Sequence, residues 1–251
     1  MSVSALLLSD SRFPAGGHAH SGGVEPAVTA GTVADLDSLE AFLRGRLRTA
    51  GLVAAGIAAA ACAHSADERR AGDGDPGRED WDQRFVTSDG FVFWGEIEAE
   101  ADARTPSPAQ RGASRRQGRA LLRAARIAWP EDRGLADLAD FTAGNGAGGP
   151  HHAVVLGAAA AAAGCDAAAA ARIAAYQSVA GPASAAVRLL ALDPMRATAV
   201  LARLARDVDR IAERAAAAAA GPLDELPCPS APALDLLAEA HLRAEVRLFE
   251  S

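Results

Sequence analysis

Apolar residues recur at intervals of three and four along much of the chain, which is the spacing of one face of an α-helix. The clearest run lies within 32–50 and consists of Leu36, Leu39, Leu43 and Leu47. Asp37 followed by Glu40 predicts a capping box near its start. Gly51 then indicates a break or a close contact between helices, before a second helical run that ends at about His64.

Pro, Gly and capping residues divide the rest of the chain into further predicted helices. Ser107 as N-cap with Pro108 in the first turn predicts a helix that runs to Ala128. Other helices are expected over 96–104, over 135–141, from the N-cap Asp166 to an interruption at Gly181 and Pro182, and from Asp193 and Pro194 onward. Since no sustained alternation of Val, Ile and Thr indicates a strand, we predict an all-α fold, a single-domain bundle of about eight to ten helices over residues 1–251.

Two segments have the composition of loops. Residues 66–82 contain almost nothing apolar, which predicts a flexible surface loop. Residues 221–232 are rich in proline and predict an extended linker before a C-terminal helix. Apolar residues continue beyond that helix to Leu248 and Phe249, so this last segment either docks on its own domain or contacts a partner.

The composition indicates closely packed helices and excludes several functions. Hydrophobic residues make up 50% of the chain, but most of them are alanine and only 4% of the chain is aromatic. Alanine has the best helix propensity and lets helix axes approach closely. All 25 basic residues are arginine, which excludes a phosphate-binding loop that needs lysine and any lysine Schiff base. The net charge of −7 also argues against a nucleic-acid-binding protein.

Cysteine usage and hydropathy predict a cytoplasmic protein that does not span a membrane. The three cysteines are scattered and form no CxxC pair or disulfide framework, as is usual in a reducing compartment. Alanine-rich runs lie near 50–63 and 153–175. The first is too short to cross a bilayer, and the second is interrupted by Asp166 and Arg172.

One N-terminal segment combines apolar, glycine and polar residues in an unusual order. Residues 6–25 read LLLSDSRFPAGGHAHSGGVE. Pro14 and the glycines that follow it cannot continue a helix, so we expect a short apolar helix, a tight loop and a second helix. Glu25 would lie in the first turn of that second helix, where a carboxylate suits the helix dipole.

This segment resembles the N-terminal signature of the UreF family of urease accessory proteins, approximately L-L-x-L-S-D-S-x-x-P-x-G-G-x-x-x-S-x-G-[LV]-E. The resemblance returns between Pro150 and Leu204, although Ala191-Leu192-Asp193-Pro194 stands where many members have Pro-Leu-Gly-Gln. Members of this family are all-α scaffolds that dimerise. They bind UreD, also called UreH, and recruit the GTPase UreG, so that nickel and carbon dioxide reach the urease apoprotein. The resemblance therefore implies a non-catalytic chaperone for nickel insertion.

The resemblance also implies which residues contact the partners. It assigns this role to surface and loop positions of the signature segment, with the end of the C-terminal helix as the contact for UreD. These positions are Ser9, Asp10, Pro14, Gly16, Gly17, His20, Ser21, Gly22, Glu25, Leu248 and Phe249. On this basis Glu25 would tolerate replacement by alanine without loss of folding, while assembly with the partners would weaken.

A row of arginines follows one face of the helix predicted after Ser107: Arg111, Arg115, Arg119, Arg123 and Arg126, with Arg116 beside them. A solvated helix face is the favoured interpretation. The alternative is a docking surface for an acidic partner, for which Arg115 and Arg119 are the candidates.

The histidines predict neither a metal site nor another cofactor site. His18 and His20 are two imidazoles without a third ligand nearby, so packing in the loop is favoured over metal binding. His151 and His152 would point about 100° apart on a helix, which makes a poor chelate. No nucleophile motif is present, so the chain is not expected to be an enzyme. The alternative is a helical metal-binding enzyme that uses His18, His20 and Glu25.

Overall fold

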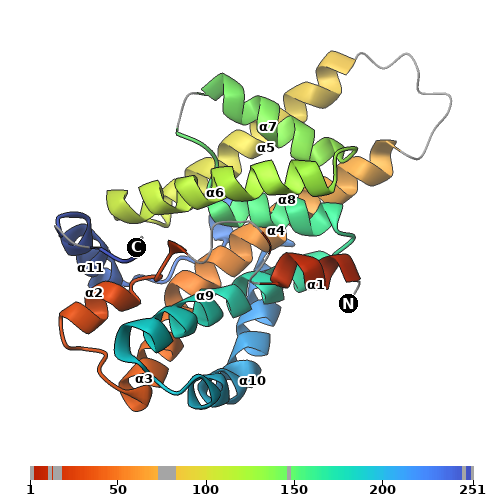
Figure 1. The fold of residues 1–251 in the computed structure, drawn as a ribbon. Helices are drawn as coiled ribbons and strands as arrows, with labels where there is room; N and C mark the ends of the chain where they lie inside the picture. The colour runs from red at the N-terminus through yellow and green to blue at the C-terminus, as the bar shows by residue number, and fades with distance from the viewer. Residues whose placement is uncertain are drawn as a thin grey trace.

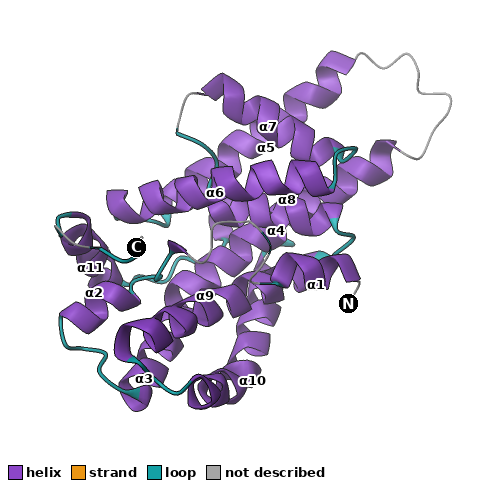
Figure 2. Ribbon diagram, in the orientation of Figure 1, coloured by secondary structure: helices purple, strands orange, loops and turns teal. Residues whose placement is uncertain are grey.

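A computed structural model of the chain describes residues 3–10, 13, 19–72, 83–145, 148–244 and 247–249, without the side chains of 70–72, 83–89 and 145. Within these ranges the chain forms α-helices and contains no β-strand (Figure 2). The prediction of an all-α bundle is confirmed.

Eleven α-helices are present in the described ranges (Figure 1). They are α1 (Val3–Ser9), α2 (Val24–Thr29), α3 (Leu36–Arg46), α4 (Leu52–Gly72), α5 (Gln83–Ala103), α6 (Pro108–Ala128), α7 (Arg133–Asn145), α8 (His152–Ala162), α9 (Ala167–Leu190), α10 (Pro194–Ala218) and α11 (Pro232–Leu242). A π-helical turn over Leu47–Gly51 joins α3 to α4, so these two helices are continuous.

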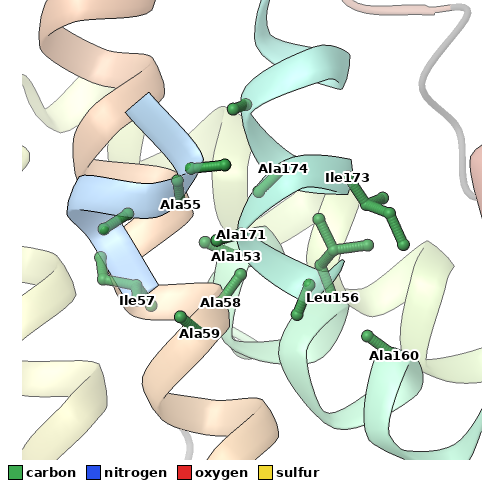
Figure 3. Packing of buried hydrophobic residues seen from close by; sticks show 14 of the residues in the cluster. Ala55, Ile57, Ala58, Ala59, Ala153, Leu156, Ala160, Ala171, Ile173 and Ala174 are labelled. Atoms are coloured by element: carbon green, nitrogen blue, oxygen red, sulfur yellow. The ribbon is translucent and has the colours of Figure 1, made fainter. Parts of the chain in front are cut away.

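Three alanine-rich helices form the centre of the bundle. Helix α4 packs against both α8 and α9, and the contact residues are mostly alanines (Figure 3). Helix α8 is buried on almost every side. In Figure 1, α5, α6 and α7 lie on one side of this centre, and α3 and α10 lie on the other. Because alanine side chains are short, the helix axes approach closely and few large side chains are needed to fill the core.

The closest approach within this centre is made at Gly157 of α8. A Cβ atom at this position would lie 2.3 Å from the carbonyl oxygen of Ala58 and 2.6 Å from the Cβ atom of Ala61. The neighbouring atoms belong to α4, and the nearest of them is backbone, so they cannot rotate away. Glycine is therefore required where α8 crosses α4.

Three of the four predicted capping residues are confirmed, whereas the helix expected over 96–104 begins earlier, at Gln83. Ser107 accepts a hydrogen bond from the Gln110 amide, and Asp166 and Asp193 cap α9 and α10 in the same way. The predicted capping box of Asp37 and Glu40 is wrong. Asp35 is the N-cap of α3, and its side chain and that of Ser38 each bond the other residue's amide, over 2.9 and 3.0 Å.

The predicted loop over 66–82 is wrong in its first part, because α4 continues to Gly72. His64 and Glu68 form an i,i+4 pair at 3.1 Å on this stretch. The Arg69 guanidinium reaches Asp132, 3.3 Å away at the start of α7. The Arg69–Asp132 ion pair thus links the polar end of α4 to α7. Residues 73–82 lie outside the described residues.

The predicted interruption at Gly181 and Pro182 is also wrong, since α9 runs through both residues. Pro182 has no amide hydrogen, so the carbonyl oxygen of Ser178, four residues earlier, loses its helical donor. Arg46 supplies a replacement, because its Nε atom donates to this oxygen over 3.0 Å. A side chain from α3 therefore satisfies the backbone group that would otherwise interrupt the helix.

One helical stretch, Leu36–Arg69, is long and apolar enough to cross a membrane by length and composition. Of its most apolar part, 67% is buried inside the protein. Its apolar residues therefore pack into the alanine-rich centre, as in the core helix of a soluble protein.

We expect Gly157→Ala to lower the free energy of unfolding by about 1–3 kcal/mol, because the added methyl group overlaps the Ala58 carbonyl. Gly45→Ala is the matched control, since Gly45 is exposed on α3 and nothing lies within 4 Å of its Cβ position. This control should gain about 0.5–1 kcal/mol from helix propensity. Urea unfolding followed by circular dichroism measures both changes. A Gly157→Ala protein as stable as the parent would contradict the close crossing.

Candidate functional site

The N-terminal signature segment, residues 6–25, meets the C-terminal tail at Glu25. The tail is the part of the chain that follows α11, and the structure describes its residues 247–249. This residue lies in the first turn of α2, and its side chain is buried, with 7% of its surface exposed. Its carboxylate accepts hydrogen bonds from the backbone amides of Leu248 and Phe249, over 2.7 and 2.9 Å. Figure 1 shows α11 beside α2. Segments more than 220 residues apart in sequence are joined by one carboxylate.

Two further side chains hold the tail in place. His241 of α11 is buried, and its Nε2 atom lies 3.1 Å from the carbonyl oxygen of Phe249 and 3.4 Å from the Glu25 carboxylate. The guanidinium of Arg188 lies 4.3 Å from the centre of the Phe249 ring, in a cation–π contact. We call Glu25, His241, Leu248 and Phe249 the tail latch. The tail thus docks on its own domain, one of the two outcomes predicted for it.

Glycine makes the turn that leads into α2 possible. Gly23, the N-cap of α2, has φ of +88°, in the left-handed region that side chains disfavour. A Cβ atom here would lie 3.6 Å from Leu234 of α11 and 3.7 Å from the ring of Phe42. The glycine turn therefore directs α2 toward α11 and places Glu25 under the tail.

A cavity of about 470 Å³ lies beside the tail latch, between the signature segment, α6 and α9. Four residues that were assigned to partner binding line it together: Ser9, Asp10, His20 and Gly22. The structure thus brings part of the predicted set into one place. Three others, Pro14, Gly16 and Gly17, lie outside the described residues, as does His18.

Two signature residues are not at the surface where they were expected. Ser21 is fully buried, and Glu25 is covered by the tail that it binds. Leu248 is 74% exposed, whereas Phe249 is buried. That Glu25→Ala leaves the fold intact stays a prediction, and the structure adds that this change would leave two tail amides without their acceptor. Whether these residues contact a partner stays a prediction.

Arg115 is mostly covered by a network of ion pairs and is not part of an exposed arginine row. Only 15% of its side chain is exposed, and it donates to Glu98 over 3.1 Å, to Asp102 over 2.8 Å and to the Gly149 carbonyl over 2.6 Å. Arg119 is exposed, as the solvated-face interpretation requires. The predicted docking role therefore fits Arg119 better than Arg115.

The same network fixes the start of α8. Glu98 accepts a hydrogen bond from the His151 amide over 2.7 Å, and burial raises the pKa of this carboxyl to about 7. The His151 ring bridges Asp102, at 2.9 Å, and Ser114, at 3.0 Å, while burial lowers its pKa. Sequence reasoning missed Glu98, Asp102 and Ser114, although the i,i+4 spacing of the two carboxylates placed them on one helix face.

The alternative site of His18, His20 and Glu25 is not assembled in the described part of the chain. His20 lines the cavity, whereas Glu25 binds the tail and is not among the cavity residues. Among the described residues, no group of three or more His, Cys, Asp or Glu side chains is placed to hold a metal ion.

Comparison with known proteins decides the family. Residues 33–205 match the sequence model of UreF. The urease accessory protein UreF of Mycolicibacterium vanbaalenii is 45% identical over 246 residues, which cover 98% of this chain and 97% of that protein. The chain belongs to the UreF family of urease accessory proteins. The UreF proteins of Mycobacterium marinum and Mycobacterium bovis are 43% and 41% identical over the same length. The resemblance read from the sequence is confirmed.

Within this UreF-family fold, we expect Glu25→Gln to release the tail without unfolding the bundle. In Glu25 each carboxylate oxygen accepts one backbone N–H, from Leu248 or Phe249. The glutamine side chain is uncharged and replaces one of these oxygens by an NH₂ donor, so the two charge-assisted bonds are lost. Hydrogen exchange at these two amides should become at least about tenfold faster, which corresponds to about 1.4 kcal/mol of local stability. Glu213→Gln on the exposed face of α10 is the control and should leave the tail unchanged. Unaltered tail exchange in Glu25→Gln would show that the latch does not hold the tail.

Proposed function

We propose that this chain is a non-catalytic scaffold for urease maturation, which binds UreD (UreH) and recruits and regulates the GTPase UreG. In this role it acts as a chaperone for the insertion of nickel into the urease apoprotein, in the cytoplasm and as a homodimer. The observation that carries the proposal is similarity over nearly the full chain to proteins named urease accessory protein UreF. The absence of lysine also fits a protein that controls a nucleotide-binding partner without binding nucleotide itself.

The region around the tail latch is the proposed surface for UreD. Glu25 holds the tail against the signature segment, so a partner that docks on one also meets the other. Three leucines of α11 and the tail are largely exposed, namely Leu236, Leu242 and Leu248. Exposed apolar residues beside a polar rim are typical of protein interfaces.

Regulation of UreG requires only that the scaffold bind one state of the GTPase better than the other. The exposed arginines of α6, among them Arg119, offer a positive face to an acidic surface of such a partner. Arg115 would act on this face indirectly, because its ion pairs fix α6 against α5.

Co-purification tests the proposal. We expect the tagged chain to retain UreD, and to retain UreG in the presence of UreD, nickel and a non-hydrolysable GTP analogue. Light scattering should give a symmetric complex with two copies of this chain. Glu25→Gln should retain less UreD than the parent, because release of the tail disrupts the surface, whereas Glu213→Gln should retain as much.

The control for the partners is their own folded state, measured by circular dichroism and by GTP binding to UreG. Failure of the parent chain to retain either folded partner would contradict the scaffold function. Stoichiometric metal and a measurable turnover in the purified chain would instead support the enzyme alternative.

A further inference from the structure

Arg46, the last residue of α3, directs a charged side chain into the cavity beside the tail latch. Its Cζ atom lies 3.2 Å from the position that a Cβ atom would occupy at Gly22, so the guanidinium packs directly against the signature segment. Burial lowers the pKa of Arg46 to about 10. The side chain is half-buried and is still a cation at neutral pH.

Only one of the three guanidinium nitrogens of Arg46 has a hydrogen-bond acceptor among the described residues. The Nε atom donates to the Ser178 carbonyl, which Pro182 leaves without a helical donor. Among the described residues, no acceptor is found for the two terminal nitrogens, and no carboxylate lies within 4.0 Å of them. The structural role opposite Pro182 thus explains one nitrogen, while the two terminal nitrogens belong to a residue that lines the cavity. A half-buried guanidinium with two unused pairs of N–H donors and no counter-charge within 4.0 Å favours an anionic ligand.

The other charges around the cavity are consistent with an anion. Arg188 is a second guanidinium in its wall, and Asp10 is the one carboxylate among the described lining residues. Burial lowers the pKa of His152 to about 4, so this lining residue is neutral and takes no part in the charge balance at pH 7. Gln177 and Ser184 of α9 add polar groups to the same wall.

We propose that this cavity binds a small oxyanion through the terminal nitrogens of Arg46. Two parallel N–H groups of a guanidinium match two oxygens of a carboxylate, bicarbonate, phosphate or sulfate group. The volume of about 470 Å³ is large enough for such a group together with the molecule that carries it or several waters. The inference does not depend on the proposed scaffold function, because it concerns only this chain.

Calorimetric titration of the full-length chain tests the proposal. The probes are sodium formate and bicarbonate, which are planar, and sodium sulfate and phosphate, which are tetrahedral, each against sodium chloride at equal ionic strength. We expect saturable binding with a dissociation constant of about 1 mM for at least one shape, and the preferred shape identifies the ligand class. Arg46→Gln should weaken this binding at least about tenfold, whereas Arg214→Gln, which removes an exposed charge of α10, should not change it.

A second variant keeps the test valid if Arg46→Gln does not fold. Ala50 lines the same cavity four residues after Arg46, so Ala50→Glu places a tethered carboxylate beside the guanidinium. This variant should remain folded and lose the anion binding, because its own carboxylate occupies the site. Saturable binding that survives in Ala50→Glu or in folded Arg46→Gln would overturn the proposal. Heat signals from the parent chain no larger than those for chloride would overturn it too.

Discussion

The close packing of α8 on α4 is the constraint on which the rest of the structure depends. Gly157 sits against the Ala58 carbonyl, and alanines line the contacts of α4 with α8 and α9. Each such contact buries little area, so stability must come from many short side chains at close distance rather than from a few large ones. A core of this kind tolerates little added volume at its centre.

Two arginine side chains donate hydrogen bonds to backbone carbonyls at irregular points of the chain, opposite a proline in α9 and in the linker before α11. Arg46 donates to the carbonyl opposite Pro182, and Arg104, whose side chain is 4% exposed, donates to the carbonyls of Leu223, Asp224 and Leu226 in the proline-rich linker. Arginine suits this task because it keeps its charge when buried and presents several donors in a fixed plane. These bonds attach the linker that leads to α11 to the end of α5.

The fold could largely be predicted from the sequence, because the spacing of leucines and the caps at Ser107, Asp166 and Asp193 are local signals. Predictions from local sequence failed where a residue distant in sequence compensated for a local helix breaker. Arg46, for example, donates to the carbonyl that Pro182 leaves without a donor, and α9 continues through the proline. The signature segment could be found as a pattern, but the partner of Glu25 could not. Glu25 accepts hydrogen bonds from the backbone amides of Leu248 and Phe249. Every residue except proline has such an amide, so the sequence does not single out these two.

The position of Glu25 has a consequence for any partner that displaces the tail. In the docked state its carboxylate receives two amide hydrogen bonds inside a buried site. A partner that removed the tail without replacing these donors would leave a carboxylate buried and unpaired, which is strongly unfavourable. Displacement is therefore favoured only for a partner that brings its own donors to the end of α2 or opens the site to water. In this way a buried charge can select among partners that an exposed apolar surface would bind without distinction.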